Sequence, residues 1–452
     1  MSQAFTGLWG GLYLSLPTVA LTLVVAEPSL VSSAVAAAVS VIAAMNLFPL
    51  VEGICAWLST ERLLEKPGRI TPLPDASAVI LAYLPNEQSI IYATARYFLE
   101  TLEYPSQLQI VLAYNTPRRL PVEDDLEALS RAHPRFTLLR VDSSRKKATN
   151  INAAIDVIDT PVIGFFDADS RPERACFVKA CRWLVKGYDF VQGANEIGSP
   201  FGSILQRIIA IEYLLKYQIS YTGRQFAFGV AYFSGSNGYW RTEAAKAVRA
   251  RDNAQVEDID MALRALLAGH RLVYDPDIVA NEQAPPNIFA WWRQRVRWAQ
   301  GWAQLLRWYQ SPVLRSHHLG IVKKAVWTFF LLGRRLLGPG AVVVALLGLM
   351  LQCLFGEHFS AVEGVSVGSL FGVQAMATAY TSFLCFRIPR AKRQGKPLEG
   401  WAFILYDLVF PIYDLIRIFT ILFAGRALFT DPIVWHPTPR AAARRTDNDN
   451  RS

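Results

Sequence analysis

Two carboxylates lie one residue apart at the end of a strongly apolar run. Val162–Phe166 leads directly into Asp167 and Asp169, within the stretch PVIGFFDADSRPE. Like charges this close repel each other, and the repulsion is stronger beside an apolar strand, where the effective dielectric constant is low. A divalent cation shared by both carboxylates would relieve the repulsion, and its open coordination positions would accept phosphate oxygens.

Three other interpretations of the carboxylate pair are open. The pair could lie in a solvated turn, or it could cap a helix, since DSRPE suits a helix start. It could also be the nucleophile pair of a phosphatase. That chemistry places the pair after the first strand, whereas here at least three predicted strands precede it.

A second acidic group begins a predicted helix in QVEDIDMALRALLAGHRLVYDP, residues 255–276. Glu257, Asp258 and Asp260 stand in its first turn, and the apolar residues that follow have helical spacing. A carboxylate held there at a cleft could take a proton from a hydroxyl group. The alternative is structural, because acidic residues in a first turn are stabilised by the helix dipole.

Cations and tryptophans alternate in WWRQRVRWAQGW, residues 291–302. The fork of donors on an arginine meets the oxygens of a diphosphate in pairs. A tryptophan face suits the apolar face of a sugar ring. A helix lying on a membrane surface would have a similar composition and is the alternative interpretation.

The elements that must position these groups form an α/β domain. Short apolar runs at residues 77–85, 108–115, 136–142 and 161–169 are predicted strands, and stretches with helical spacing lie between them. This alternation predicts a parallel sheet with helices on both faces. Ligands gather at the carboxyl ends of such strands, where Asp142 and the pair Asp167 and Asp169 stand.

The composition also predicts a membrane protein. Of the 452 residues, 52% are hydrophobic and only 18% are charged. Four stretches contain no charged residue: 2–26, 29–51, 336–356 and 364–386. About 20 residues suffice to span the roughly 30 Å hydrocarbon core of a bilayer. We expect four spans, the first two forming a hairpin rather than a signal peptide.

The net charge of +9 is best explained by the membrane as well. No basic-aromatic module indicates nucleic-acid binding. Basic residues instead follow the apolar runs, at 61–69 and 387–396, and recur in the tail after Arg440, which reads as disordered. The positive-inside bias therefore places both termini and the polar middle of the chain in the cytoplasm. The five scattered cysteines indicate neither a zinc site nor a disulfide scaffold.

Three further segments are apolar but carry charges. Residues 201–220 and 321–338 have the composition of helices in the headgroup plane, although the first also suits a core helix. Residues 398–425 are long enough to span. Their Asp407, Asp414, Arg417 and Pro411 predict an interfacial or re-entrant helix instead, because a charge at the bilayer centre costs at least ~2.5 kcal/mol.

Three motifs occur in the order of a known signature: DAD (Asp167–Asp169), VED (Val256–Asp258) and QRVRW (Gln294–Trp298). Together they resemble the D…DxD…(T)ED…QxxRW signature of membrane-embedded, processive family 2 glycosyltransferases, which include cellulose, chitin, hyaluronan and curdlan synthases. KKATNINAAI (146–155), FSGSNGYWR (233–241) and WHPTPR (435–440) are similar to three minor motifs of that family. The resemblance covers about residues 75 to 440.

The resemblance implies a GT-A fold, an α/β domain inserted between transmembrane and interfacial helices. The domains we expect are a transmembrane hairpin (1–60), a cytoplasmic GT-A domain (61–310), interfacial and transmembrane helices (311–430), and a gating segment with a disordered tail (431–452). The implied location is a bacterial inner (cytoplasmic) membrane, crossed several times, with the catalytic domain in the cytoplasm.

The same resemblance implies roles for individual residues. Asp167 and Asp169 hold Mg²⁺ or Mn²⁺ on the diphosphate of a nucleotide sugar, and Asp258, beside Glu257, is the general base. The implied nucleotide-sugar-binding residues are Asn86, Glu87, Asn115, Lys147, Gln294, Arg297, Trp435 and Arg440, the last two in a gating segment. The implied acceptor-binding residues are Gly235, Asn237, Arg241 and Trp298. Asn115 replaces a family Asp that reads uracil, which leaves the nucleotide open.

By this resemblance we expect an inverting enzyme that moves a sugar, with UDP the expected carrier, to the end of a growing β-linked polysaccharide and feeds the glycan through its own helices. One alternative is the addition of a single sugar to a membrane lipid. Another is a non-catalytic membrane subunit that senses a nucleotide sugar. Control by a second messenger would need an accessory export or regulatory subunit as a partner.

Overall fold

The structure is a computed structural model that describes residues 28–61, 67–68, 71–142, 146–198, 203–355, 398 and 400–425. The predicted spans at 2–26 and 364–386, the basic segment 387–396, Trp435, Arg440 and the tail therefore lie outside the described residues. Of the turn expected at Glu27–Ser29 in the predicted N-terminal hairpin, Glu27 also lies outside the described residues, whereas Pro28 and Ser29 are the first residues of a helix.

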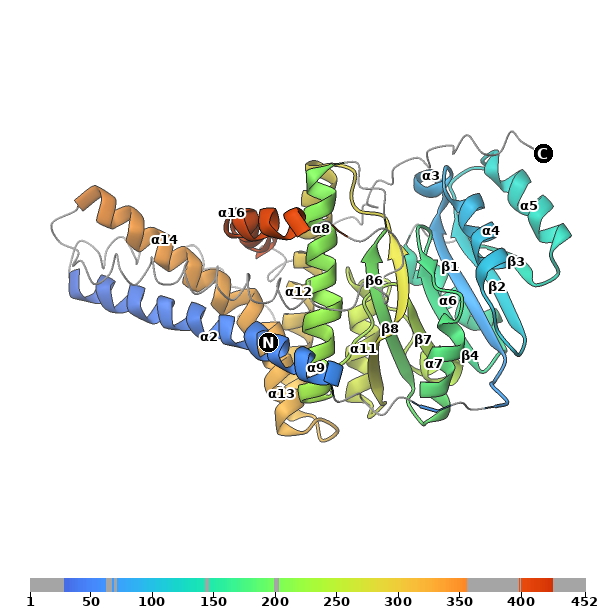
Figure 1. Ribbon diagram of the computed structural model, residues 1–452, viewed down its shortest axis with the longest axis horizontal. Coiled ribbons are helices and arrows are strands. Elements are labelled where there is room, and N and C mark those ends of the chain that lie inside the picture. Colours follow the sequence, from blue (N-terminus) through green and yellow to red (C-terminus); the bar gives the residue numbers. More distant parts are fainter. Residues whose placement is uncertain are drawn as a thin grey trace.

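The largest described part of the chain is built on one sheet of eight strands in the order β3-β2-β1-β4-β7-β6-β8-β5 (Figure 1). The strands are β1 (Ala76–Tyr83), β2 (Leu108–Asn115), β3 (Phe136–Arg140), β4 (Val162–Asp167), β5 (Arg171–Pro172), β6 (Phe190–Ile197), β7 (Gly238–Arg241) and β8 (Leu272–Glu282). The first four agree closely with the four strands predicted from the apolar runs.

The sheet is mixed rather than wholly parallel. Strands β1 to β4 are parallel, as their alternation with helices predicts, and β6 is parallel to β8. Strand β7 runs antiparallel between β4 and β6, and β5 runs antiparallel along β8 at the edge. The sequence pattern misses β7 because it is only four residues long and follows a loop rather than a crossover helix.

Helices cover both faces of the sheet. Alternating residues of β1 enter two separate cores: Ala78 and Ile80 face one, Val79 and Leu81 the other. The first core is closed by α4 (Ile91–Thr101), α5 (Val122–Ala132) and α7 (Cys176–Val185). The second is closed by α6 (Lys147–Val157), α10 (Thr242–Val248), α11 (Glu257–Leu267) and α12 (Ile288–Arg315). The short helix α3 (Leu84–Glu87) follows β1 directly.

The predicted interfacial segment 201–220 is a core helix in this structure. From Ser203 onward it forms α8 (Ile204–Leu214), the π-helical segment η1 (Leu215–Tyr221) and α9 (Thr222–Phe228) in succession. Ile209, Ile211 and Tyr217 are almost completely buried in the second core. The alternative interpretation, an amphipathic core helix, is therefore the one that the packing supports.

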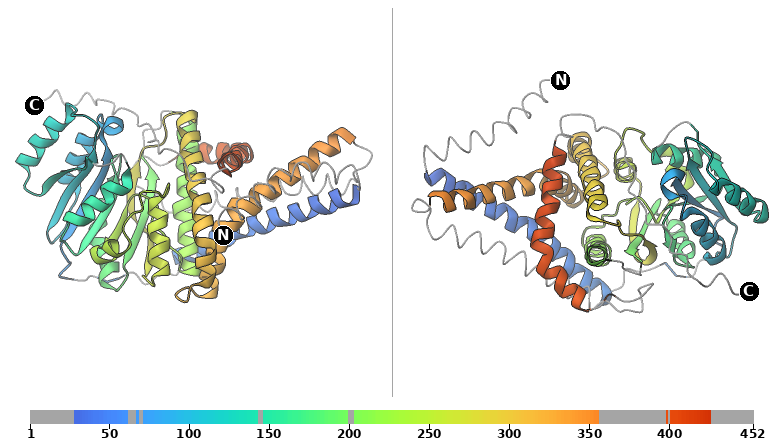
Figure 2. Two further views of the ribbon diagram at one scale, coloured as in Figure 1. Left: turned by 180° about the vertical axis from the view of Figure 1, so that it is seen from behind. Right: turned by 90° about the horizontal axis from the view of Figure 1, so that it is seen from above.

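Two apolar helices extend side by side from the sheet domain (Figures 1 and 2). The first is α2 (Pro28–Glu61). The second is α14 (Gly338–Phe355), which continues α13 (Ile321–Thr328) and the π-helical segment η2 (Phe329–Leu337) without a break. Residues 321–338 are thus not a separate interfacial helix. By length and composition alone, Ser33–Ser59 and Ile321–Gly348 could each cross a membrane.

Helix α16 (Gly400–Ala424) crosses these two helices instead of running along them. Figure 1 shows α16 nearly end-on, whereas α2 and α14 lie across the view, and the view from above in Figure 2 shows it along its length. It is not among the described helices that are long and apolar enough to span. Its exposed residues are Trp401, Ile404, Leu408, Ile412, Phe419 and Phe423.

Candidate active site

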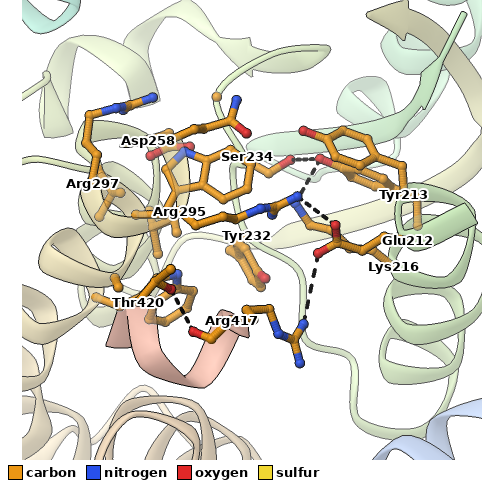
Figure 3. A pocket seen from close by; sticks show the side chains of 18 of the residues that line it. Glu212, Tyr213, Lys216, Tyr232, Ser234, Asp258, Arg295, Arg297, Arg417 and Thr420 are labelled. Atoms are coloured by element: carbon orange, nitrogen blue, oxygen red, sulfur yellow. Dashed lines mark hydrogen bonds and ion pairs between the residues drawn. The ribbon is translucent and has the colours of Figure 1, made fainter. Parts of the chain in front are cut away.

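A cavity of about 520 Å³ lies where the carboxyl ends of β1, β2 and β4 meet α11 and α12. Asn115 and Asp167, the last residues of β2 and β4, line it together with Glu257 and Asp258 at the start of α11. Figure 3 shows Asp258 and Arg297 on one side, with Glu212 and Lys216 on the other. The sheet thus brings together motifs that are far apart in the sequence.

The positive group beside Asp167 in this structure is Lys147, at the start of α6. Its ammonium group donates to Asp167 Oδ1 and, at 2.7 Å, to the carbonyl oxygen of Gly235, and it lies 4.0 Å from Glu257 Oε1. Burial would lower the pKa of Lys147, but the carboxylates of Asp167 and Glu257 outweigh it and raise that pKa above its ordinary value. Lys147 is therefore a cation held between two of the predicted site carboxylates.

Asp258 has the properties of a general base that works near neutral pH. Burial and the neighbouring Glu257 carboxylate raise its pKa to about 7, against the opposing effect of Lys147. Gly235, which has a left-handed φ of +97°, lies directly against it: a Cβ added there would be 3.1 Å from Asp258 Oδ2. Asp260, by contrast, is fully buried in an ion pair with Arg264 and accepts from Tyr309 Oη. Only two of the three acids of this turn therefore face the cavity.

The two acids predicted as metal ligands have different surroundings. Asp167 lines the cavity, whereas Asp169 is 3% exposed and its Oδ2 accepts from the backbone N–H of Gln283 at 3.0 Å. Among the described residues, no group of three or more His, Cys, Asp or Glu side chains could hold a metal ion. Two carboxylates suit a cation that takes its remaining ligands from phosphate oxygens and water, and Mg²⁺ is usually bound by proteins in this way.

Helix α12 supplies three of the predicted contacts. Gln294, Arg297 and Trp298 all line the cavity, as the spacing of QRVRW on one helix face requires. Gln294 is 8% exposed, and its Oε1 has no hydrogen-bond partner among the described atoms. Val256 packs against Gly301, where an added Cβ would lie 2.6 Å from Val256 Cγ1, so α11 and α12 meet at close range.

The predicted nucleotide-binding residues after β1 serve first to shape the turn. Glu87 Oε2 accepts from the backbone N–H of Tyr83 at 2.6 Å, and Asn86 Nδ2 donates to Glu87 Oε1 at 2.7 Å. Glu87 lines the cavity and Asn86 does not. Asn115 is 2% exposed and lines the cavity at the end of β2, in register with Tyr83.

Two of the predicted acceptor-binding residues lie away from the cavity. Asn237 is fully buried, and its amide donates to the carbonyl oxygens of Ala194 and Ile278 at 3.0 and 2.9 Å. Arg241 pairs in register with Val162, at the opposite end of β4 from Asp167. The antiparallel course of β7, which the sequence pattern does not reveal, explains this correction for Arg241.

Several cavity residues were missed by the sequence motifs, and the most prominent is Lys216 on η1. Burial and the nearby Arg295 lower the pKa of Lys216 to about 8, and its ammonium group lies 4.6 Å from the ring centre of Tyr217. The available signal was a lysine beside aliphatic and aromatic residues in the stretch IEYLLKYQIS. Glu212, Arg334, Arg335 and Arg417 also line the cavity and belong to no motif.

A polar network attaches α16 to the wall of the cavity. Glu212 Oε2 on α8 accepts from Arg295 Nη2 and from Tyr413 Oη, each at 2.6 Å. Tyr413 Oη in turn accepts from Trp291 Nε1 at 2.9 Å. Arg417 on α16 pairs with Asp414 and approaches Glu212 to 4.0 Å (Figure 3). Asp414 and Arg417 of α16 therefore face the cavity.

Comparison with known proteins agrees with this site. Residues 162–385 match the family described as Glycosyl transferase family group 2. The matched region begins at β4 and includes the DAD, VED and QRVRW motifs.

Relatives of this chain are named as glycosyltransferases. It is 29% identical over 209 residues to the probable glucomannan 4-beta-mannosyltransferase 7 of Oryza sativa subsp. japonica, a match covering 45% of this chain and 36% of the rice protein. It is 25% identical over 267 residues to the probable glycosyltransferase YdaM of Bacillus subtilis (strain 168), covering 57% of this chain and 62% of that one. The chain thus spans well under half the length of the plant relatives.

A solved structure shares the fold. The mannosyltransferase PcManGT from Pyrobaculum calidifontis, in complex with GDP-Man and Mn²⁺, superposes with a TM-score of 0.56 at 17% identity, covering 83% of this chain and 99% of that one. The likeness supports the expected α/β, GT-A-like fold. Residues 162–385 of the chain thus match the family 2 glycosyltransferases, and its relatives are themselves named as glycosyltransferases.

Proposed function

We propose that the cavity catalyses the transfer of a sugar from a nucleotide sugar to an acceptor hydroxyl, with inversion at the anomeric carbon. The observation that carries the proposal is the position of Asp258. Its carboxylate has a pKa of about 7 and lines the same cavity as Asp167 and the apolar residues of α2 and α14. A base poised near neutral pH is suited to deprotonating a hydroxyl group.

The donor would be held at the Asp167 end. Asp167 and Asp169 would hold Mg²⁺ or Mn²⁺, which when bound compensates the charge of the diphosphate and of the leaving nucleoside diphosphate. Gln294 and Arg297 on α12 would contact the diphosphate oxygens, and Asn115 would face the nucleotide base. The GDP-Man and Mn²⁺ named with the Pyrobaculum enzyme make GDP-mannose a donor to test beside UDP-linked sugars.

The chemical step needs little from the protein beyond positioning and a base. Asp258 accepts the proton of the acceptor hydroxyl as its oxygen attacks the anomeric carbon from the side opposite the diphosphate. The new carbon–oxygen bond forms while the bond to the diphosphate oxygen breaks, so nucleoside diphosphate leaves and the configuration inverts to β. Trp298 offers its ring face to the acceptor sugar. Glu257 keeps the pKa of Asp258 raised.

The setting proposed for this reaction is a bacterial inner membrane. The apolar stretches Ser33–Ser59 and Ile321–Gly348 would span it, with the sheet domain in the cytoplasm. Helix α16, which crosses both, would lie in the interface with its apolar side towards lipid and its charges towards α8 and α12. Trp435 and Arg440, outside the described residues, would belong to a segment closing over the nucleotide.

Two acceptors are compatible with this arrangement. Extension and translocation of a β-linked polysaccharide is supported by the names of the plant relatives, which are glucomannan mannosyltransferases. Addition of a single sugar to a lipid is supported by the cavity itself, because residues of α2, α14 and α16 line its membrane-side part. An accessory subunit for export or regulation is proposed only for the case in which the acceptor is a polysaccharide.

The test is transfer by the purified chain. Incubation with a panel of radiolabelled UDP- and GDP-sugars, in bilayers containing its native lipids, should place the label in a polymer or in a lipid. The Asp258→Asn variant is the matched control and should bind donor without transferring it. Donor binding by the wild-type chain with label in neither product would support the sensing subunit and contradict the enzyme.

A further inference from the structure

The cavity has two chemically different parts. Its membrane-side part is lined by apolar side chains, among them Ile42 and Met45 on α2, Val342 on α14 and Phe410 on α16. The same cavity is lined by two neighbouring arginines on η2 and by the carboxylates of the candidate site. A ligand that fills the whole cavity must therefore combine an apolar part with an anionic part.

The two arginines are Arg334 and Arg335, which are consecutive on the π-helical segment η2. The guanidinium carbon of Arg335 lies 4.5 Å from the ring centre of Trp302, and its Nε is buried without a hydrogen-bond partner among the described atoms. Arg334 lies over Phe330 at 6.0 Å. Both side chains are half-buried and line the cavity. π-Helical turns are rare and are frequent at functional sites.

Three carboxylates of this region are already paired with other arginines. Glu52 is paired with Arg224 at 2.7 Å, and Asp414 with Arg417. Glu212 is paired with Arg295 at 2.6 Å. Within the described parts of the chain, no carboxylate lies at ion-pair distance from Arg334 or Arg335. Two adjacent, half-buried cations are costly unless an anion accompanies them.

We propose that Arg334 and Arg335 bind the phosphate group of an anionic lipid whose headgroup presents the acceptor hydroxyl to Asp258. The guanidinium fork binds phosphate oxygens in pairs, and the apolar part of the cavity accepts the first segments of the acyl chains. A neutral glycan would use neither feature. This inference rests on the proposed transferase function and names the acceptor class for it.

The distances along α12 suit such a headgroup. The ring of Trp302 stacks on the guanidinium group of Arg335. Trp302 lies one helical turn beyond Trp298 on α12, or about 6 Å along the helix axis. Gly301, next to it, packs against Val256, which immediately precedes Glu257 and Asp258. Arg335 and the base thus lie next to the same stretch of α12, and the proposal requires that a hydroxyl borne a few bonds from the phosphate spans the space between them.

The test is lipid binding by the full chain in an uncharged detergent, followed through tryptophan fluorescence because Trp302 stacks on Arg335. The probes are short-chain phosphatidylglycerol, short-chain phosphatidylcholine and glycerol phosphate without acyl chains. We expect phosphatidylglycerol to bind most tightly. Arg334→Gln with Arg335→Gln should weaken it at least about tenfold, because charged hydrogen bonds are lost. Arg335→Lys should be intermediate.

The control variant is Arg315→Gln, which removes an exposed arginine at the end of the same α12 helix. It should leave lipid binding unchanged. Equal binding of phosphatidylglycerol to the wild type and the double variant would overturn the proposal. Equally tight binding of glycerol phosphate would reduce the site to a general anion site and would also overturn it.

Nucleotide-sugar binding, measured on the same preparations, separates this proposal from the transferase function. The double variant should bind donor like the wild type, which shows that it is folded. Lipid binding by a wild-type chain that neither binds donor nor transfers sugar would contradict the transferase proposal and leave the lipid site standing. Transfer to a neutral glycan, with no effect of the arginine changes on lipid binding, would support the transferase proposal and contradict the lipid site.

Discussion

The backbone of Gly235 lies against the carboxylate of Asp258, so closely that a Cβ at Gly235 would stand 3.1 Å from Oδ2. The same glycine accepts from Lys147 through its carbonyl oxygen and has a φ of +97°. Two requirements therefore coincide at one position: a left-handed backbone and an open space beside the base.

Gly235→Ala is expected to damage catalysis more than folding. The methyl group would press on the Asp258 carboxylate, while the positive φ adds backbone strain of ~1 kcal/mol or more. We expect a large fall in turnover with a modest fall in melting temperature. Gly229→Ala is the matched control, since its φ is +59° and the nearest atom to its added Cβ lies at 3.9 Å. Equal losses of turnover in the two variants would contradict a role for the contact.

Asp258→Asn should separate binding from chemistry. The amide cannot accept the proton of the hydroxyl, so transfer should fall by ~10²–10⁴-fold or more. Donor affinity should be nearly unchanged, because the proposed role of Asp258 is towards the acceptor and not the diphosphate. Calorimetric titration with the nucleotide sugar, beside a transfer assay, measures both. An active variant would remove Asp258 from the base role and direct attention to Glu257.

The pH profile should carry the signature of the raised pKa of Asp258. The base works when deprotonated, so kcat/KM should fall about tenfold for each pH unit below about 7 and level off above it. Burial and the Glu257 charge both raise this pKa. Glu257→Gln removes the second cause and should move the acidic limb to lower pH. An unchanged limb in that variant would assign the titration to another group.

Removal of divalent cations should abolish donor binding as well as turnover. The carboxylates and the diphosphate are all negatively charged, so they repel each other unless a divalent cation lies between them. A chelator should therefore lower donor affinity, and added Mn²⁺ or Mg²⁺ should restore it. Asp169→Asn should need more metal for half-maximal activity. Arg96, exposed on α4 in a surface pair with Glu100, offers a control position where substitution leaves metal dependence unaltered. Full activity in chelator would contradict the metal role.

The ion pair between Glu52 on α2 and Arg224 on α9 should be important for stability. Arg224 Nη2 lies 2.7 Å from Glu52 Oε1, and the side chains of Glu52 and Arg224 are 0% and 3% exposed. Glu52→Gln would leave Arg224 uncompensated in the interior, which costs ~3–5 kcal/mol. Glu100→Gln, in the exposed pair with Arg96, should cost less than ~1 kcal/mol. Thermal unfolding of both variants in one detergent compares them.

The sequence predicted those parts of the site that depend on local order. DAD lies at the end of a buried strand and QRVRW on one helix face, and each motif reaches the cavity for the reason expected from its spacing. Asn237 and Arg241, which were also predicted to belong to the site, lie away from the cavity. Their positions depend on the direction of β7, which is set by pairing with β4 and β6 rather than by any pattern within its four residues.

Residues such as Glu212, Lys216 and Arg417 could not be predicted for a related reason. Each lies in a helix rich in apolar residues, and in such a helix the sequence cannot distinguish a charged residue at a membrane interface from one buried in the protein. The packing of α8, α12 and α16 decides between the two, and those helices are more than 70 residues apart in the sequence. In α16 both Asp414 and Arg417 line the cavity. The proposal that α16 lies in the membrane interface rests on its orientation across α2 and α14.

Helix α14 continues into η2 and α13 without a break, so a single helical rod runs from Ile321 to Phe355. At 1.5 Å per residue it is roughly 50 Å long, with the arginine turn about two fifths of the way along. A bilayer whose thickness does not match the apolar end would tilt the rod, as hydrophobic mismatch does for other helices. The tilt would act as a lever and shift the cavity wall formed by η2. Turnover should therefore vary with the acyl-chain length of the surrounding bilayer, even though the reacting groups lie on the sheet domain.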